Sequence, residues 1–374
     1  MRFVHDNLPQ RVCFGTGQAT EYLTSEIAAL GASRVMVIAS QRDRELVAAI
    51  TRDLPVVLRY DEVVMHVPVE IAERARAAAA QAGTDAIVSI GGGSTTGLAK
   101  AIAMTTGLPV IAVPTTYSGS EATTVWGLTE NGKKTTGTDR LVLPRTVVYD
   151  ASLTVSLPVD LSVASGLNAL AHCVDALWAP KADPINAALA TEGIRALAAG
   201  LPKVATDPRD IAGREEALYA SYVAAVSFAS AGSALHHKIC HVLGGKYNLP
   251  HAQTHATVLP YVLAFNGPAA PEASARIAGA FGYDDALDGL QRLRAVLNAP
   301  RALADYGFAE GDIPAAAEAV LPAVPPSNPR PVTAADLESL LHAAWSGADP
   351  QPRAAHLRAP VKVLKGSSPC LCGP

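Results

Sequence analysis

Histidine side chains are concentrated in one part of this 374-residue sequence. The chain has 10 histidines, and five of them fall between His236 and His255. His237 and His241 are four residues apart, so they share one face of a predicted helix. His251 follows a proline at the predicted entry to another helix. Because an imidazole changes its charge near neutral pH and is a common metal ligand, this cluster predicts either proton transfer or metal binding.

A second pair with the same spacing, Asn168 and His172, lies on an earlier predicted helix. A single histidine is more often an ordinary core or surface residue than a functional one. Here, imidazoles from three predicted elements have spacings that allow them to converge on one ion or one substrate. The residues that we predict to form a catalytic site are His172, His237, His241 and His251.

A glycine-rich turn, Gly91–Ser94, joins a predicted strand to a predicted helix in the first half of the chain. Glycines let the backbone approach a ligand without a Cβ clash, and a helix start offers free N–H groups to an anion. The turn lacks the G-x-G-x-x-G order of the standard dinucleotide fingerprint. It predicts a pyrophosphate site, and the plainer alternative is a tight turn with no ligand.

A run of hydroxyl side chains, PTTYSGSE at 114–121, follows the next predicted strand. In an open parallel sheet, ligands bind outside the carboxyl ends of the strands, so this run and the glycine turn are expected to line one cleft. A hydroxyl-rich helix cap without a ligand is the alternative. The two segments together favour a nucleotide site. The residues predicted to contact the cofactor are Ser40, Gly92, Gly93, Ser94, Thr115, Thr116, Ser118, Ser120, Lys134 and Leu153.

The end of an earlier predicted strand bears on which nicotinamide cofactor fits. In dinucleotide-binding folds, an acidic residue after an early strand often binds the adenosine ribose. Here Ser40 takes that place, and Arg42 and Arg44 lie close behind it. With no carboxylate to repel a 2′-phosphate, we expect both NADH and NADPH to serve.

The hydrophobic pattern predicts the elements that must position these residues. Short apolar, β-branched runs predict buried strands, which alternate with helical patterns. The predicted strands are 34–39, 85–90, 108–113 and 146–149, with helices at 69–82 and 95–104. Strands that are apolar throughout indicate a parallel sheet covered on both faces. The sequence therefore predicts an α/β, Rossmann-like dinucleotide-binding domain over residues 1–152.

The pattern changes after about residue 150, where strand signals nearly vanish. The predicted helices are 160–180, 184–200, 210–245, 254–265, 271–280 and 284–298, followed by a proline-rich loop at 322–331. We predict an all-helical domain over residues 153–374 that carries the histidines. The tail from about residue 350, with Cys370 and Cys372, has no apolar period and is expected to be frayed.

Composition excludes several classes of function. Lys and Arg number 30 and Asp and Glu 34, a net charge of −4, which excludes a general electrostatic grip on nucleic acid. No uncharged apolar run reaches about 18 residues, so no membrane span is expected. The five cysteines are odd in number and contain no C-x-x-C pair, which argues against a disulfide framework or a structural zinc site. With no secretory signal at the first residues, the cytoplasm is the expected compartment.

Four segments in combination resemble the iron-containing alcohol dehydrogenase superfamily. They are GGGS after a strand, PTTYSGSE, GLNALAH and HKICHVLGGKYNLPH. The resemblance implies an N-terminal dinucleotide-binding domain, an all-helical C-terminal domain and a homodimer. It also implies a metal held by one Asp and three His, and the matching positions here are Asn168, His172, His237 and His251. His241 matches a family histidine near the nicotinamide that is not a ligand.

The asparagine at position 168 departs from the family pattern. An amide oxygen is neutral and binds a divalent ion more weakly than a carboxylate does, so we expect no required metal and only a vestigial site. The sequence looks like a metal-independent branch of that superfamily, which reduces the conjugated C=C bond of maleylacetate to 3-oxoadipate in the breakdown of aromatic compounds. That activity implies a small dicarboxylate substrate.

The roles of individual residues follow from this expected reaction. His241 and His251 are expected to handle the proton, and His172 and His237 to line the site. The residues predicted to bind the substrate are Lys238, Tyr117 and Asn168, with Lys246 nearby. For two of these residues a structural role is the alternative to substrate binding. Lys238 could be a solvated helix residue, and Tyr117 could be a core residue.

Other functions remain open on the sequence alone. The first is a metal-dependent alcohol or polyol dehydrogenase, in which Asn168 is a tolerated change of ligand. The second is a lyase similar to dehydroquinate synthase, which needs a fuller metal set. A hydrolase finds no support, because neither G-x-S-x-G nor H-E-x-x-H occurs. A nucleotide-binding protein without catalysis is the last alternative.

Overall fold

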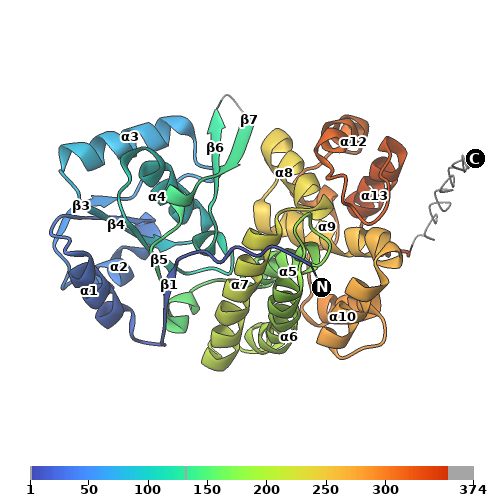
Figure 1. Ribbon diagram of the computed structural model, residues 1–374, viewed down its shortest axis with the longest axis horizontal. Coiled ribbons are helices and arrows are strands. Elements are labelled where there is room, and N and C mark those ends of the chain that lie inside the picture. The colour runs from blue at the N-terminus through green and yellow to red at the C-terminus, as the bar shows by residue number, and fades with distance from the viewer. Residues whose placement is uncertain (1, 131–132, 353–374) are drawn as a thin grey trace, which may run out of the picture.

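The chain folds into an α/β part and a helical part that lie side by side (Figure 1). The structure is a computed structural model that describes residues 2–130 and 133–352. The predicted fraying of the tail, with Cys370 and Cys372, concerns residues outside these ranges. Cys13, Cys173 and Cys240, which lie within them, are free and buried.

The α/β part is built on a six-stranded sheet in which every strand pair is parallel. The strand order is β1-β8-β5-β4-β2-β3. The strands are β1 (Arg11–Phe14), β2 (Val35–Ala39), β3 (Val56–Tyr60), β4 (Ala86–Gly91), β5 (Val110–Pro114) and β8 (Thr146–Tyr149). The four predicted strands are present within two residues of their predicted ends. The edge strands β1 and β3 were not predicted, because exposed positions interrupt their apolar runs.

Helices cover both faces of the sheet, as the apolar strands require. They are α1 (Ala19–Leu30), α2 (Arg44–Ile50), α3 (Val69–Gln81) and α4 (Gly93–Thr106). On one face Val37 packs in a core with Leu23 of α1. On the other, its neighbour Ile38 packs in a core with Leu98 of α4. An antiparallel hairpin, β6 (Val125–Glu130) and β7 (Lys133–Thr138), extends toward the helical part and was not predicted (Figure 1).

The second part is helical throughout the described residues. Its helices are α5 (Val159–Ala176), α6 (Pro184–Thr206), α7 (Ile211–Ala231), α8 (Leu235–Tyr247), α9 (His251–Asn266), α10 (Pro271–Phe281), α11 (Ala286–Val296), α12 (Ile313–Val320) and α13 (Ala334–Ser346). The prediction of one helix over 210–245 was wrong: α7 ends at Ala231, Gly232 takes a φ of +89°, and α8 sets off at 100° to α7. Nor were α12 and α13 predicted.

Within the described ranges, no single helix has the length and apolar character to cross a membrane. The pair α7 and α8 reaches that length and composition only when the two are counted together across their bend.

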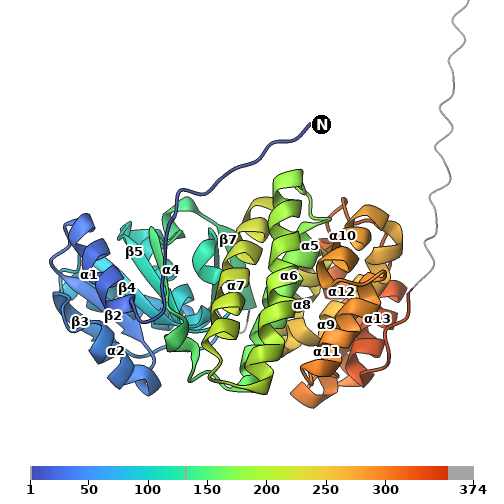
Figure 2. The same ribbon diagram turned by 90° about the horizontal axis from the view of Figure 1, so that it is seen from below.

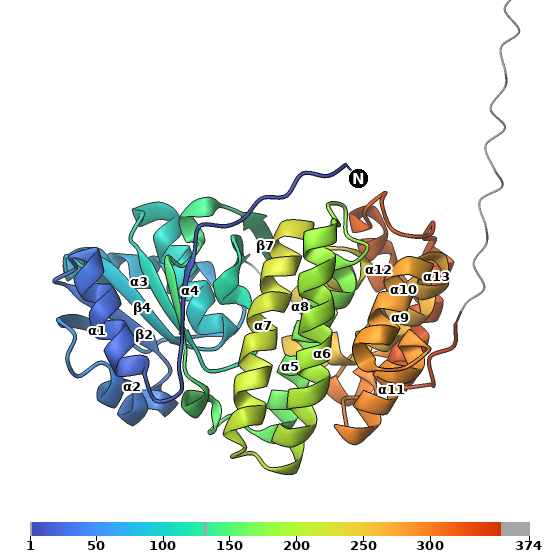
Figure 3. The same ribbon diagram turned by 60° about the horizontal axis from the view of Figure 1, so that its bottom comes forward.

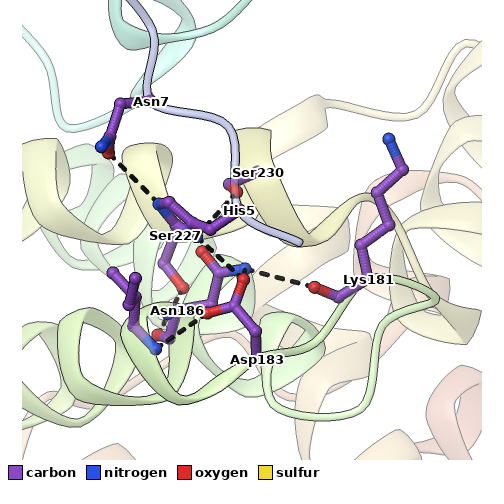
Figure 4. A network of polar contacts seen from close by, with 8 residues as sticks. His5, Asn7, Lys181, Asp183, Asn186, Ser227 and Ser230 are labelled. Carbon is purple, nitrogen blue, oxygen red and sulfur yellow. Dashed lines mark hydrogen bonds and ion pairs between the residues drawn. The ribbon is translucent and has the colours of Figure 1, made fainter. Parts of the chain in front are cut away.

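The N-terminal segment ties the two parts together. It precedes β1 in the chain and extends from β1 to the helical part, near α6 and α7 (Figures 2 and 3). There His5 Nδ1 lies 2.8 Å from Asp183 Oδ2, and the pair is buried (Figure 4). Asp183 also caps α6 by accepting hydrogen bonds from the backbone N–H groups of Ile185 and Asn186. The last sheet strand ends at Tyr149, and we propose to place the domain boundary just after it, near residue 152.

Candidate active site

A cavity of about 600 Å³ lies where the carboxyl ends of β4 and β5 face the helical part. Its wall contains residues of both candidate clusters. The sequence-predicted residues that line it are Gly92, Gly93, Ser94, Thr116, Ser118, Ser120, Asn168, His172, His237, His241 and His251. The glycine turn, the hydroxyl run and the histidines therefore share one site.

The glycine turn is closely packed against the first turn of α4 and against the hydroxyl run. Gly91 has a φ of +149°, and a Cβ on it would lie 2.5 Å from Thr95 Oγ1. A Cβ on Gly92 would lie 2.9 Å from Thr116 Cγ2. Gly92 is the N-cap of α4 and provides no side-chain cap, so the first N–H groups of α4 stay available to a ligand.

Two buried hydroxyls beside this turn have no protein partner. They are Thr116 Oγ1 and Ser118 Oγ. Buried hydroxyls are normally hydrogen-bonded, so a pair of orphans next to a free helix N-terminus fits the phosphate oxygens of a dinucleotide. The residues present therefore fit the nicotinamide cofactor that the fold implies.

A lysine that the sequence analysis did not select holds the hydroxyl run in place. Lys100 of α4 is fully buried, and its Nζ lies 2.6 Å from the carbonyl oxygen of Ser120. The carbonyl oxygens of Thr123 and Val125 each lie 2.8 Å from the same nitrogen. Burial lowers the pKa of Lys100 to about 7, and the nearby Glu121 opposes this shift. Three carbonyl acceptors match the three N–H donors of an ammonium group.

His237 is oriented by a buried carboxylate. Asp175 Oδ2 lies 2.7 Å from His237 Nδ1 and also accepts hydrogen bonds from the backbone N–H groups of Ala234 and His237. The same carboxylate therefore caps the start of α8 and fixes the His237 ring. Because Nδ1 faces Asp175, Nε2 is left without a partner at the cavity wall. Burial lowers the pKa of His237 well below its usual value, so the ring is neutral at neutral pH.

His172 lies face to face with His237. The ring centroids are 5.0 Å apart with an interplanar angle of 21°, and Phe228 lies against both rings. Burial lowers the pKa of His172 to about 4. Its neighbour Asn168 is 1% exposed, and Asn168 Oδ1 has no hydrogen-bond partner.

The residues at the four family ligand positions form a weaker donor set for a divalent metal ion than the Asp and three His of the family pattern. They are one neutral amide and three imidazoles, without the carboxylate that hard divalent ions favour. The ligand nitrogens of His172, His237 and His251 do not all lie within 4.8 Å of one another.

Behind the cavity, a second histidine pair is buried with a cysteine. In residues 2–130 and 133–352, His236, Cys240 and His255 alone form a His, Cys, Asp or Glu group whose ligand atoms all lie within 4.8 Å. His236 Nε2 lies 2.9 Å from His255 Nδ1, a distance typical of a hydrogen bond between two imidazoles. Burial lowers the pKa of His236 to about 3.

Several predicted residues lie away from the cavity wall. Tyr117 is fully buried, and its hydroxyl accepts a hydrogen bond from Arg214 Nη1 at 3.0 Å, which favours the core role left open above. Lys238 is half-buried on α8 but does not line the cavity, since its neighbour His237 takes the inward face. Lys246 lies farther along α8, where its Nζ donates to the carbonyl oxygen of Ala315.

The remaining cofactor predictions lie on the α/β side. Thr115 sits beside the glycine turn and donates its N–H to the carbonyl oxygen of Gly91. Ser40 lines a separate hollow of about 120 Å³ at the end of β2, together with Arg44. Leu153 packs in the core of the α/β part. Lys134 pairs with Thr129 in the hairpin, and its side chain lies outside what the structure describes.

The hairpin and a preceding loop line the cavity without having been predicted. Trp126 and Thr136 of the hairpin form part of the wall, as do His66 and Val67 before α3. Thr129 joins the two segments by hydrogen bonds to the carbonyl oxygens of His66 and Val67. The Asn-Gly pair at 131–132, between the runs 125–130 and 133–138, was a usable hairpin signal in the sequence, but nothing in it indicates that the hairpin lines the cavity of the histidines.

Comparison with known proteins gives consistent results along the chain. Residues 9–151 match the family model of iron-containing alcohol dehydrogenases, and residues 162–345 match that of the C-terminal part of the Fe-containing alcohol dehydrogenase family. The chain is 44% identical to a maleylacetate reductase of Pseudomonas sp. strain P51, over 94% of this chain and 100% of the relative.

Solved structures agree with this fold. A structure of an iron-containing alcohol dehydrogenase from Corynebacterium glutamicum superposes with a TM-score of 0.92 at 61% identity, over 94% of this chain and 98% of that chain. A maleylacetate reductase from Rhizobium sp. strain MTP-10005 superposes with a TM-score of 0.87 at 44% identity, over 94% of this chain and 100% of that chain. The chain belongs to the iron-containing alcohol dehydrogenase family of oxidoreductases.

Proposed function

We propose that this enzyme reduces the conjugated C=C bond of maleylacetate to give 3-oxoadipate, with NADH or NADPH as reductant and without a required metal. The observation that carries the proposal is the neutral donor set of Asn168 and three histidines, which lines the same cavity as the uncapped N-terminus of α4. The similarity to maleylacetate reductases over 94% of the chain supports it.

The cofactor would be held by the α4 N-terminus and by the hydroxyls of Thr116 and Ser118. When bound, the nicotinamide supplies the hydride. The hollow at the end of β2 is lined by Ser40, by the two arginines Arg44 and Arg59, and by one carboxylate, Asp61. We infer that both NADH and NADPH serve, and a ratio of their kcat/KM values above about a thousand would contradict this.

Reduction of an alkene conjugated to a ketone needs a proton as well as a hydride. Hydride addition at the carbon β to the ketone leaves an enolate, which must gain a proton at the α carbon. His172 and His237 are held neutral by burial, so they are poor acids at neutral pH. His241 and His251 line the same cavity from α8 and from the start of α9, and we assign the proton transfer to them.

One finding favours a second candidate, a metal-dependent alcohol dehydrogenase. The Corynebacterium glutamicum protein that is 61% identical to this chain is described as an iron-containing alcohol dehydrogenase. The two candidates are separated by following NADH oxidation with maleylacetate and, in parallel, with simple aldehydes. Our proposal expects rapid oxidation with maleylacetate alone, and rapid oxidation only with aldehydes would replace it by the second candidate.

We further infer that the enzyme is a cytoplasmic homodimer, as the family resemblance implies. Light scattering on the purified enzyme tests the dimer, which predicts twice the chain mass of 38.6 kDa.

A further inference from the structure

The cavity wall carries almost no charge that would bind a dicarboxylate. Within the described residues, Lys100 is the one Lys or Arg that lines it, and no Asp or Glu does. The Lys100 ammonium group is already bonded to the carbonyl oxygens of Ser120, Thr123 and Val125. A substrate with two carboxylates, as the proposed function requires, must therefore find other donors.

The N-terminus of α9 is such a donor. This 16-residue helix begins at His251, and its N-cap, Pro250, provides no side-chain hydrogen bond. His251, Ala252 and Gln253, the first turn of α9, all line the cavity together with Pro250. The first N–H groups of a helix have no partner within it and carry about half a positive charge, which favours a carboxylate.

The neighbouring helix start shows what a satisfied N-terminus looks like in this protein. Asp175 accepts the backbone N–H groups of Ala234 and His237 and so occupies the N-terminus of α8. At the α9 N-terminus the N-cap residue Pro250 provides no side-chain hydrogen bond. The described cavity wall contains no Asp or Glu side chain that could take the place of such a cap.

Asn168 supplies an independent sign of a ligand in this cavity. Its side chain is nearly fully buried, lines the cavity, and leaves Oδ1 without a partner. The oxygen and nitrogen of an amide are nearly isosteric, so the side chain can present its NH₂ group to an anion. Ring contacts from His172 through His237 and His255 to His251 connect the α5 face that bears Asn168 to the start of α9.

We propose that the N-terminus of α9 and the amide of Asn168 together bind one carboxylate of the substrate. The inference rests on the proposed function and assigns it a substrate subsite. It also explains why position 168 is an amide: an aspartate there would set a second negative charge against the substrate carboxylate.

Two nearly isosteric substitutions test the subsite. Asn168→Asp adds a charge beside the bound carboxylate, and Gln253→Glu places a competing carboxylate in the first turn of α9. Glutamate in a first turn stabilises a helix, so Gln253→Glu is expected to fold. We expect each variant, assayed with chelator present, to raise the KM for maleylacetate about tenfold or more, because hydrogen bonds to charged groups are strong. The KM for NADH should stay within about twofold.

Matched variants away from the cavity serve as controls. Asn7→Asp and Gln81→Glu make the same changes on exposed residues and should leave both KM values unchanged. Asn168→Ala removes the amide without adding charge, so its KM for maleylacetate should lie between those of the wild type and Asn168→Asp, which keeps the test informative if Asn168→Asp folds poorly. Unchanged KM values in Gln253→Glu and Asn168→Ala would overturn the subsite. Failure of the wild type to reduce maleylacetate would instead overturn the proposed function.

Discussion

Asp175 and His237 form a buried pair in which the carboxylate oxygen Oδ2 lies 2.7 Å from the imidazole Nδ1. The same oxygen accepts the backbone N–H groups of Ala234 and His237, so Nδ1 is the ring nitrogen that donates to it and Nε2 is left as the acceptor of the neutral ring. Asp175 thus sets the tautomer of His237. Asp175 itself does not line the cavity.

Replacing this carboxylate should disturb the site more than the fold. Asp175→Asn keeps an oxygen to cap α8 but no longer fixes the protonated nitrogen of His237. We expect kcat/KM for maleylacetate to fall about tenfold or more, with an unchanged circular dichroism spectrum. Asp285→Asn, the same change at the cap of α11, is the control and should retain wild-type kinetics. Equal activity of the two variants would contradict the role of Asp175.

Lys100 is expected to act on cofactor binding by holding the Ser120–Val125 backbone. Lys100→Met should raise the KM for NADH about tenfold with a smaller effect on kcat, because three hydrogen bonds to that backbone are lost. Since the pKa of Lys100 is lowered to about 7, the wild-type KM for NADH should rise as the pH increases above 7. This pH dependence should be absent in Lys100→Met, and its persistence there would count against the assignment. The exposed Lys203→Met is the matched control.

The two proposed proton-transfer residues can be tested singly. General acid–base catalysis is typically worth about a hundredfold or more, so His241→Ala and His251→Ala should each lower kcat for maleylacetate by about that factor. His342→Ala, at an exposed histidine of α13, should not change kcat. If both site variants keep more than about a tenth of the wild-type kcat, the assignment is wrong.

The link between the N-terminal segment and α6 should contribute to stability. Asp183→Ala removes the cap of α6 and the partner of His5, and we expect a loss of about 1–2 kcal/mol in the free energy of unfolding. Burial raises the pKa of Asp183, but hydrogen bonds from the backbone of Asn186 and from His5 outweigh it, so the net shift is downward. A lowered folded-state pKa stabilises the fold above about pH 4 and loses this contribution below it. Urea titrations should therefore show the wild type and Asp183→Ala converging at low pH, and a constant difference would contradict this account.

Removal of metal should leave the reaction intact. The amide at position 168 and the separated imidazole nitrogens predict full activity with maleylacetate after treatment with a chelator. The measurement is kcat together with the metal content of the same sample. Loss of activity that Fe²⁺ or Zn²⁺ restores would favour the metal-dependent alternative.

The α/β part could be predicted well because its buried strands are apolar throughout. The runs that became β2, β4, β5 and β8 read as strands without tertiary information, and the glycine turn marked the start of α4. The edge strands and the hairpin could not be predicted in the same way, because their half-exposed residues owe their conformation to pairing with distant segments.

Only those site residues whose spacing along the chain matches the period of a helix could be predicted from the sequence. The pairs Asn168–His172 and His237–His241 follow from helical spacing, and all four residues reach the cavity. Lys100 and Asp175 could not be selected, since their roles depend on groups about 20 and 60 residues away. Lys238 is adjacent in sequence to His237, but on a helix adjacent residues face different directions.

The most direct test of the central claim is the fate of the hydride. The enzyme is supplied with maleylacetate and NADH that carries deuterium at the transferred position, and the product is examined by NMR. Carbon-bound deuterium at the position β to the ketone, in 3-oxoadipate whose ketone is intact, is the predicted result. Deuterium on a newly formed alcohol carbon would show that the carbonyl is reduced instead and would contradict the account.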